Sequence, residues 1–432
     1  METDTKNRDI SKKIKINFIP IMFIVAIISR MFAVSHVWYA FLLGCLSYFL
    51  ISNQKMFASI LYRTRYLIVL FAIIAVNTFG THLDSGNSVH YTLVLISFLL
   101  TILLGACSYL SYGPKHLKRG LLTTNKIIFV SAIFGWYESI IQNNPLKPYM
   151  PVFFHANTVG TELYRPSSFF THAIPFSNIL LIGIIINNTL VKNNIKRFIS
   201  NILYVVVLFM TGTRSAWLIL VLLIVVGATR PIVNNISFTR NQLIVFLTGV
   251  AVGVMALFYT TFGQNVILTI TERFGRLTGD DHGAVSLDQR TGAIDFVLES
   301  FFGTFSIIHW LFGYGHRATR ILMGQVVIVL ENFVTTDNQW IAMLYNYGLV
   351  ATIMLIVFFV KKTRRYLLTE DSLYTCCFLI FLMCLAAMFF YELFNWETVN
   401  VFMMMMIGVF IAITYKDKLD KKYLKGFNHD QK

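Results

Sequence analysis

Twelve apolar stretches divide this sequence, and each is close to the length with which an α-helix crosses the hydrocarbon core of a membrane. Hydrophobic residues make up 56% of the chain and charged residues 13%, with a mean hydropathy of +0.65, which excludes an ordinary soluble domain. The stretches are continuously apolar rather than alternating, so they predict helices and not the strands of a membrane barrel. We therefore expect an all-α, polytopic integral membrane protein with about 12 transmembrane helices, forming a single membrane domain over residues 1–432. The predicted spans are 16–34, 36–52, 66–80, 91–112, 126–142, 172–189, 197–212, 215–229, 242–262, 338–360, 373–391 and 397–415.

The Lys and Arg residues predict which way the chain crosses the membrane. Of the 36, 27 fall in alternate connections and at the two ends, eight fall in the other connections, and Arg30 falls within the first span. Connections rich in Lys and Arg stay in the cytoplasm. The distribution therefore predicts cytoplasmic termini, a cytoplasmic 361–372 connection and two long external segments, 143–171 and 263–337. It also accounts for the net charge of +15, because basic inner loops attract anionic headgroups, so no nucleic acid partner is expected.

The positions of the cysteines and the absence of metal-binding and nucleotide-binding motifs limit the kinds of chemistry to expect. All five cysteines fall inside predicted spans, where we expect them to pack as small apolar side chains. The sequence has no Walker loop, no HExxH or CxxC pattern and no Asp-x-Asp pair. We therefore expect neither a metal nor a cofactor, and we do not expect a cytosolic nucleotide-sugar donor.

The 263–337 segment contains about 75 residues, which is far longer than an ordinary connection and typical of a functional loop. Ser286 to Gln289 fits a capping box, and apolar residues follow it at helical spacing. This pattern predicts a short amphipathic helix on the outer membrane surface. Arg290 would lie in its first turns, and Asp295 and Glu299 would share a polar face.

Arg214 is the most specific single candidate for a functional residue. The sequence MTGTRSAWL places it at the predicted outer tip between two apolar spans. A buried arginine at this depth is costly unless an anionic group pairs with it. The alternative is a long basic side chain that extends to the lipid headgroups.

Two further arginines lie in the predicted external segments. Arg165 and Arg290 are weaker candidates individually, because external loops normally carry solvated charges, and each is equally compatible with a structural role. Together with Arg214 they could form a planar, bidentate, permanently charged receptor for a pyrophosphate.

Asp337 lies immediately before the tenth predicted span, in TTDNQWIAMLYNYGLV. An Asp in this place is a normal helix N-cap. A carboxylate here could instead orient or deprotonate a substrate hydroxyl, and the two roles can coexist, although a carboxylate bound to backbone amides makes a poorer base.

Four aromatic or basic positions complete the list of candidates. His172 and His316 could act as acid–base groups, although single histidines near a membrane surface more often serve as hydrogen-bonding residues. His316 and Arg317 follow a glycine-rich turn that identifies no nucleotide site by itself. Trp396 could stack against a sugar ring, although Trp is expected at membrane interfaces in any case.

These features resemble the O-antigen ligase and polymerase superfamily of bacterial envelope glycosyltransferases, over roughly residues 150–360. The matching pieces are the TGTR turn that ends at Arg214, the segment around Arg290 with WLFGYG downstream, and the Asp337–Asn338 pair before LYNYGLV. The resemblance implies a donor glycan on undecaprenyl pyrophosphate, outer arginines that bind the pyrophosphate, and no metal. In ligase-type members the polar pair generally begins with histidine, so Asp337 favours a polymerase.

We therefore predict a Wzy-type polysaccharide polymerase of the bacterial inner membrane. It would move a growing O-antigen, capsular or exopolysaccharide chain from its lipid pyrophosphate to a hydroxyl of the next lipid-linked repeat unit. The implied partners are undecaprenyl-pyrophosphate-linked glycans, membrane lipids, a chain-length regulator and a flippase. The alternatives are a ligase that uses another acceptor and, less favoured because few charges fall within spans, a lipid-linked sugar flippase. The predicted catalytic residues are Arg214, Arg290 and Asp337, and the predicted substrate-binding residues are Arg165, Asn338, His172, His316 and Arg317.

Overall fold

The computed structural model describes residues 17–84, 86–151, 164–233, 282–329 and 333–429. Every regular element in these residues is a helix, and they contain no strand, which confirms the predicted all-α class. The helices are α1 (Phe18–Met31), α2 (Ser35–Ser52), α3 (Gln54–Thr81), α4 (Ser88–Ile141), η1 (Lys147–Tyr149), α5 (Ala173–Leu190), α6 (Asn194–Met210), α7 (Arg214–Val233), α10 (His282–Gly303), α11 (Ile307–Phe312), α12 (Ala318–Met323), α13 (Gln339–Leu368), α14 (Ser372–Ala387), η2 (Leu393–Asn395) and α15 (Glu397–His429).

Six of the described helices are long and apolar enough to cross a membrane, namely α2, α3, α4, α5, α13 and α15, and α1, α7 and α14 are shorter apolar helices. Eleven of the predicted spans overlap a helix, and the twelfth, 242–262, lies outside the described residues. The protein is therefore a helical membrane protein by length and composition.

Two of the long helices are broken at a glycine. In α4, Gly113 has a φ of 76° and precedes Pro114, so the predicted spans 91–112 and 126–142 are two helical segments that join there. In α13, Gly348 has a φ of 74°. These dihedrals are accessible to glycine but strained for other residues, which explains why the breaks occur at these positions.

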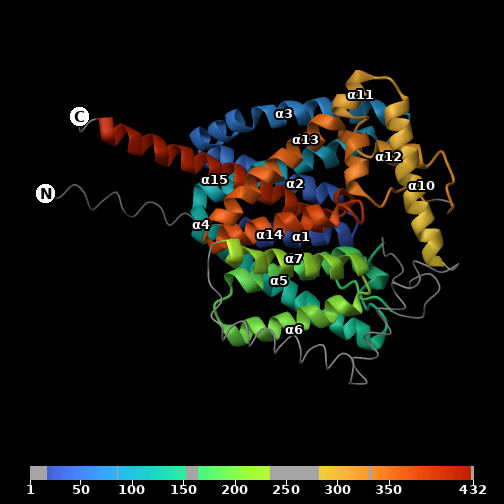
Figure 1. Ribbon diagram of the computed structural model, residues 1–432, viewed down its shortest axis with the longest axis horizontal. Coiled ribbons are helices and arrows are strands. Elements are labelled where there is room, and N and C mark those ends of the chain that lie inside the picture. The colour runs from blue at the N-terminus through green and yellow to red at the C-terminus, as the bar shows by residue number, and fades with distance from the viewer. Residues whose placement is uncertain (1–16, 85, 152–163, 234–281, 330–332, 430–432) are drawn as a thin grey trace.

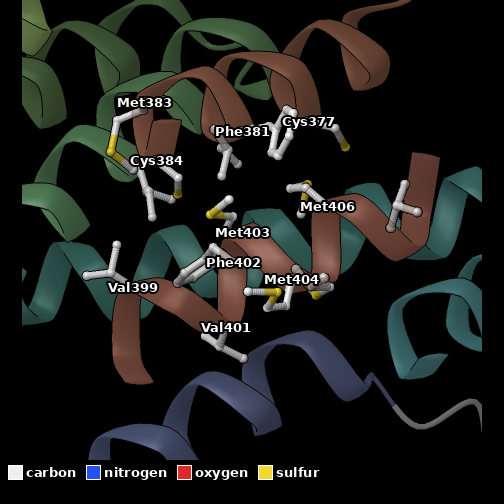
Figure 2. Packing of buried hydrophobic residues seen from close by; sticks show 14 of the residues in the cluster. Cys377, Phe381, Met383, Cys384, Val399, Val401, Phe402, Met403, Met404 and Met406 are labelled. Atoms are coloured by element: carbon white, nitrogen blue, oxygen red, sulfur yellow. The ribbon is translucent and has the colours of Figure 1, made fainter. Parts of the chain in front are cut away.

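The core lies between α4, α14 and α15. Methionines and phenylalanines of α15 meet cysteines and phenylalanines of α14 (Figure 2). A Cβ added to Gly408 of α15 would lie 2.0 Å from the carbonyl oxygen of Ile102, so α4 and α15 approach backbone to backbone. Small residues at such a crossing allow the close packing that holds membrane helices together. All five cysteines are free and buried, which confirms their predicted packing role.

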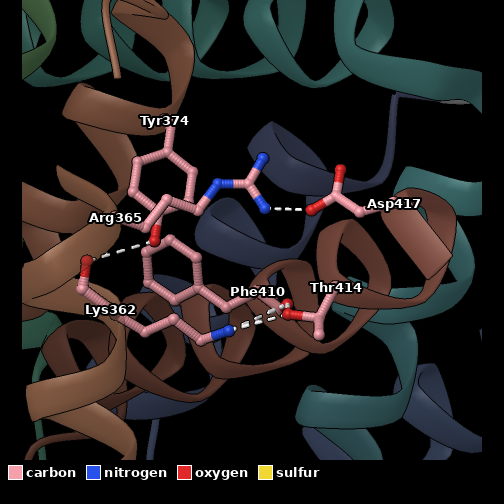
Figure 3. A network of polar contacts seen from close by, with 6 residues as sticks. All are labelled: Lys362, Arg365, Tyr374, Phe410, Thr414 and Asp417. Atoms are coloured by element: carbon pink, nitrogen blue, oxygen red, sulfur yellow. Dashed lines mark hydrogen bonds and ion pairs between the residues drawn. The ribbon is translucent and has the colours of Figure 1, made fainter. Parts of the chain in front are cut away.

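The ends of α13, α14 and α15 are joined by polar contacts at one end of the bundle (Figure 3). Arg365 forms an ion pair with Asp417, and Nζ of Lys362 donates to Oγ1 of Thr414 at 2.8 Å. Lys362 and Arg365 belong to a predicted inner connection. The helices α10, α11 and α12, which come from the predicted 263–337 external segment, lie at the opposite end (Figure 1). The predicted inner and outer residues are thus separated along the length of the bundle.

Candidate functional site

The predicted catalytic residues Arg290 and Asp337 are in direct contact. Nε and Nη2 of Arg290 lie 3.1 and 3.0 Å from Oδ2 of Asp337, so the contact joins segments 47 residues apart. Oδ1 of Asp337 accepts a second hydrogen bond from the hydroxyl of Thr335 at 3.1 Å. The side chains of Arg290 and Asp337 are 45% and 25% exposed, so a bound molecule can reach the pair.

Arg290 is positioned by the amphipathic helix α10. Val297 and Phe301, two residues of the predicted apolar face, are buried together with Ala293, whereas Phe302 of that face is exposed. Asp295 and Glu299 are exposed on the polar face, as the sequence pattern predicted. The predicted start of this helix at Ser286 was wrong, because α10 begins at His282. Gln289, the last residue of the proposed capping box, instead accepts a hydrogen bond from the backbone N–H of Val329 at 2.9 Å.

Asp337 is not the N-cap of α13. The cap is the next residue, Asn338, whose Oδ1 accepts hydrogen bonds from the backbone N–H groups of Trp340 and Ile341 at 3.0 and 3.2 Å. The capping interpretation of Asp337 was therefore wrong, and the carboxylate remains available to Arg290. Asn338, which was predicted to bind substrate, uses its side-chain oxygen to cap the N-terminus of α13.

A second carboxylate, Glu392 between α14 and α15, supports this region. Its Oε1 accepts from the backbone N–H and the hydroxyl of Thr336 at 2.9 and 3.0 Å, and its Oε2 accepts from Nδ2 of Asn395 at 2.6 Å. Burial raises the pKa of Glu392, and the nearby charge of Asp337 acts in the same direction. We call Thr335, Thr336, Asp337, Arg290 and Glu392 the Asp337 cluster.

Arg165 supports the turn that carries Arg214. Its Nε donates to the carbonyl oxygen of Thr211 at 2.7 Å, and its Nη2 donates to the hydroxyl of Thr213 at 3.1 Å. Gly212 between them has a φ of 60°. Arg214 is the first residue of α7 and is partly buried. The structure thus brings two of the three predicted phosphate-binding arginines into one unit, in which Arg165 positions the turn.

Glu138, which the sequence analysis did not select, anchors the segment that carries Arg165. This buried carboxylate at the end of α4 accepts from the hydroxyl of Tyr164 at 2.5 Å and from the backbone N–H groups of Ser167 and Ser168 at 3.0 and 2.7 Å. A charged group at the end of an apolar span was the only available signal, because its partners lie 26 to 30 residues away.

The indole ring of Trp396 lies near the side chains of Arg30 and His172. The guanidinium of Arg30 lies 5.4 Å from the centre of the indole ring, and the ring of His172 lies 5.2 Å from it. Nδ1 of His172 accepts from the backbone N–H of Ile174 at 3.1 Å and so caps α5. Burial, followed by the nearby charges of Arg165 and Arg30, lowers the pKa of His172 to about 3, so it is a weak base.

Arg30 was missed as a site residue because the sequence placed it inside a span. It occupies the last turn of α1, at the same end of the bundle as Trp396. The charges of Arg30 and Arg317 both act on Glu397, at the start of α15. We call Arg30, His172, Trp396, Glu397 and Arg317 the Trp396 cluster.

Arg317 links the two clusters. Its Nε donates to Oδ1 of Asn395 at 3.0 Å, and the same Asn395 donates to Glu392. The guanidinium also lies 5.1 Å from the ring centre of Tyr91. A single amide side chain therefore connects the carboxylate beside Asp337 to the second group of arginines.

His316 lies beneath these groups and is 1% exposed. Its Nδ1 lies 2.5 Å from the hydroxyl of Tyr347, and burial together with the charge of Arg317 holds its pKa well below the ordinary value. Its backbone N–H donates to the hydroxyl of Thr78 at 2.8 Å. The contacts of His316 are those of a buried supporting residue.

The chemical character of this end of the bundle is that of a site for an anion. Arg30, Arg165, Arg214, Arg290 and Arg317 all belong to it, and guanidinium groups suit the paired oxygens of phosphates and pyrophosphates. Within the described ranges, no group of three or more His, Cys, Asp or Glu side chains is placed to hold a metal ion.

Comparison with known proteins returns no match, either among protein-family models or among curated proteins. A fold alone does not establish a function, so the functional assignment depends on the residues of the site and their geometry. The feature with the clearest chemical consequence is the partly exposed contact of Arg290 with Asp337.

Proposed function

We propose that this protein is a metal-independent membrane glycosyltransferase that polymerises lipid-linked oligosaccharide repeat units. In this proposal the chain crosses the bacterial inner membrane about twelve times, both termini are cytoplasmic, and 143–171 and 263–337 lie outside. The donor is a glycan on undecaprenyl pyrophosphate, and the acceptor is a hydroxyl of the next lipid-linked repeat unit. The contact between Arg290 and Asp337 is the observation that carries the proposal.

Arg290 and Asp337 would exchange partners when the donor binds. Nε and Nη2 of Arg290 both face one carboxylate oxygen of Asp337. A pyrophosphate carries more negative charge than a carboxylate and would bind the same two nitrogens more strongly. Binding of the pyrophosphate to Arg290 would leave Oδ2 of Asp337 available. Asp337 would then accept the proton of the acceptor hydroxyl.

The transfer is a single displacement at the anomeric carbon. The bond from that carbon to the pyrophosphate oxygen breaks, and its electron pair leaves with the lipid pyrophosphate. Arg214 and Arg290 stabilise the charge that develops on this leaving group, which is the largest contribution expected from the protein. The acceptor oxygen forms the new glycosidic bond as its proton passes to Asp337.

A charge exchange between the two residues tests the proposal. Arg290→Asp removes a group that stabilises the leaving group, and Asp337→Arg removes the general base, whose loss costs on the order of a hundredfold or more, so each change should abolish chain extension. The double variant restores an ion pair and should regain thermal stability in detergent without regaining activity. Asp295→Asn, which removes an exposed carboxylate of the same helix, is the control and should extend chains normally. Parental extension by the double variant would show that the pair is only structural.

The acceptor distinguishes the polymerase from its rivals. Purified protein incubated with one lipid-linked repeat unit and no other acceptor should produce a ladder of polymer. A ligase would produce no ladder until another acceptor is added. A flippase would move the lipid between leaflets without forming a glycosidic bond.

A further inference from the structure

An apolar cavity of about 220 Å³ lies between α3, α4, α13 and α15. All its lining side chains are apolar except for the hydroxyl of Tyr347, so it suits hydrocarbon and not a sugar. Pockets for drug-sized ligands usually measure roughly 300–1,000 Å³, so this one is narrow. We call this cavity the slot. Representative lining residues are Leu70, Ile74, Phe98, Ala351, Phe358 and Met404.

The slot is elongated along the helices. On α3 its lining runs from Leu67 to Ile74 and on α15 from Met403 to Ile411, and a helical rise of about 1.5 Å per residue makes these distances about 10–12 Å. The hydrocarbon core of a bilayer is about 30 Å thick. The slot therefore follows the direction of a lipid chain through roughly a third of that core.

One end of the slot lies directly below the Trp396 cluster. Tyr347 and Phe394 line this end, and the hydroxyl of Tyr347 lies 2.5 Å from Nδ1 of His316, next to Arg317. Phe394 precedes Asn395, whose Oδ1 accepts from Arg317 at 3.0 Å. A chain in the slot would thus begin beneath a guanidinium group.

Arg30 offers a second donor at the same end. Its Nε is buried, and no acceptor for it occurs among the described residues. A buried N–H group without a partner is costly, so the site is stabilised when an acceptor reaches it. An anionic oxygen in front of Arg30 and Arg317 would satisfy this donor.

We propose that the slot holds the first isoprene units of the acceptor lipid, whose pyrophosphate binds Arg317 and Arg30, while the donor pyrophosphate binds Arg214 and Arg290. The inference rests on the proposed function, because that function requires such lipids as substrates. A polyprenyl carrier has one chain, which matches a narrow slot, whereas a membrane phospholipid has two. Arg317 does not line the slot but follows His316, which contacts the lining residue Tyr347, and its guanidinium complements a pyrophosphate at that end.

Photocrosslinking of the full-length protein in nanodiscs of phosphatidylcholine tests the proposal. The probe is geranylgeranyl diphosphate that carries a diazirine on its chain, and labelled peptides are mapped by mass spectrometry. Labels should occur in α3 and α13, and undecaprenyl pyrophosphate should compete with them. A diazirine-bearing phosphatidylcholine should not label the same positions.

Variants on opposite walls of the slot provide the decisive comparison. Ala351→Trp and Ile74→Trp each fill the slot from a different helix and should reduce labelling by about tenfold. Leu218→Trp is the matched control, because Leu218 lines a separate groove between α7, α13 and α14. Arg317→Ala should also reduce labelling, whereas Arg320→Ala, which removes an exposed arginine of the helix that follows Arg317, should not.

The outcomes separate this inference from the proposed function. Unchanged labelling in folded Ala351→Trp and Ile74→Trp proteins, or equal labelling by the phosphatidylcholine probe, would refute the slot, even if the parent protein forms polymer. Slot-dependent labelling by a parent protein that forms no polymer would leave the slot intact and refute the polymerase.

Discussion

Arg165 shows how a side chain selected for one role can perform another. Its two hydrogen bonds hold both ends of the turn from Thr211 to Thr213, immediately before Arg214. A lysine carries the same charge but presents a single ammonium group, which cannot bridge two acceptors in this fixed geometry. A substitution of Arg165 should therefore affect activity by displacing Arg214.

We predict that Arg165→Lys lowers chain extension strongly, because hydrogen bonds of a charged donor contribute about 1.5–3 kcal/mol each. Thr213→Val removes only one acceptor and should have a smaller effect. A double-mutant cycle measured as initial rates should show that the two changes are not additive, since they disrupt one contact. Additive effects would mean that Arg165 acts on the substrate independently of the turn.

The lowered pKa of His172 predicts how the stability of the protein depends on pH. Its pKa is lowered from 6.5 to about 3 in the folded protein, so between these values the unfolded chain binds the additional proton. Stability therefore falls as the pH drops below about 6.5. His172→Asn retains a good N-cap and removes the titrating ring, so it should flatten the pH dependence between pH 7 and 5. The measurement is thermal unfolding in detergent, and equal pH profiles for both proteins would contradict it.

The break in α13 at Gly348 is also the place where residues 311–315 pack against this helix, backbone to backbone. A Cβ on Gly348 would lie 2.4 Å from the carbonyl oxygen of Leu311, and one on Gly313 would lie 2.3 Å from the backbone of Asn346. The backbone N–H groups of Tyr314 and Gly315 donate to the carbonyl oxygens of Tyr345 and Asn346 at 2.9 and 2.8 Å. The segment that ends at Arg317 is therefore docked on α13 by its backbone.

We predict that Gly348→Ala destabilises the protein more than Gly113→Ala. Both glycines have positive φ, so each substitution strains the backbone by about 1–3 kcal/mol. A Cβ on Gly113 meets no atom within 4 Å, whereas one on Gly348 meets the backbone of the docked segment. Thermal unfolding of the two variants measures the difference, and equal losses would show that the docking contact contributes little.

The sequence predicted elements better than contacts. The apolar run at 172–189 predicted α5, observed at Ala173–Leu190, because burial in a membrane is visible in local composition. The same reasoning classed Arg30 only as a charge inside a span, and it did not select Glu138. Their partners lie in other segments, and apolar periodicity does not specify which helix ends meet. Arg290 was selected from its place in a long external segment and Asp337 from its place before an apolar span, and their direct contact became evident only from the structure.

For the molecule as a whole, the arrangement of basic residues predicts the direction of insertion. Arg364 lies in the last turns of α13, and Glu299 lies in α10. Helix α10 lies at one end of the bundle, and α13 runs from there toward the other end (Figure 1). We predict that a membrane-impermeant maleimide labels Glu299→Cys in intact cells, but labels Arg364→Cys only after permeabilisation. The native cysteines are buried, so background labelling should be low. The reverse pattern would invert the topology and place the site in the cytoplasm.

The contact of residues 313–316 with α3 can form only late in the synthesis of the chain. Nδ2 of Asn77, in α3, donates to the carbonyl oxygen of Gly313 at 3.0 Å, and these residues are 236 positions apart. Ribosomes add about 5–20 residues per second, so α3 exists for roughly 10–50 s before this partner is made. During that interval the polar side chains at the C-terminal end of α3 must be satisfied by water or by the insertion machinery. Asn77 therefore lacks its final partner while 236 further residues are synthesised.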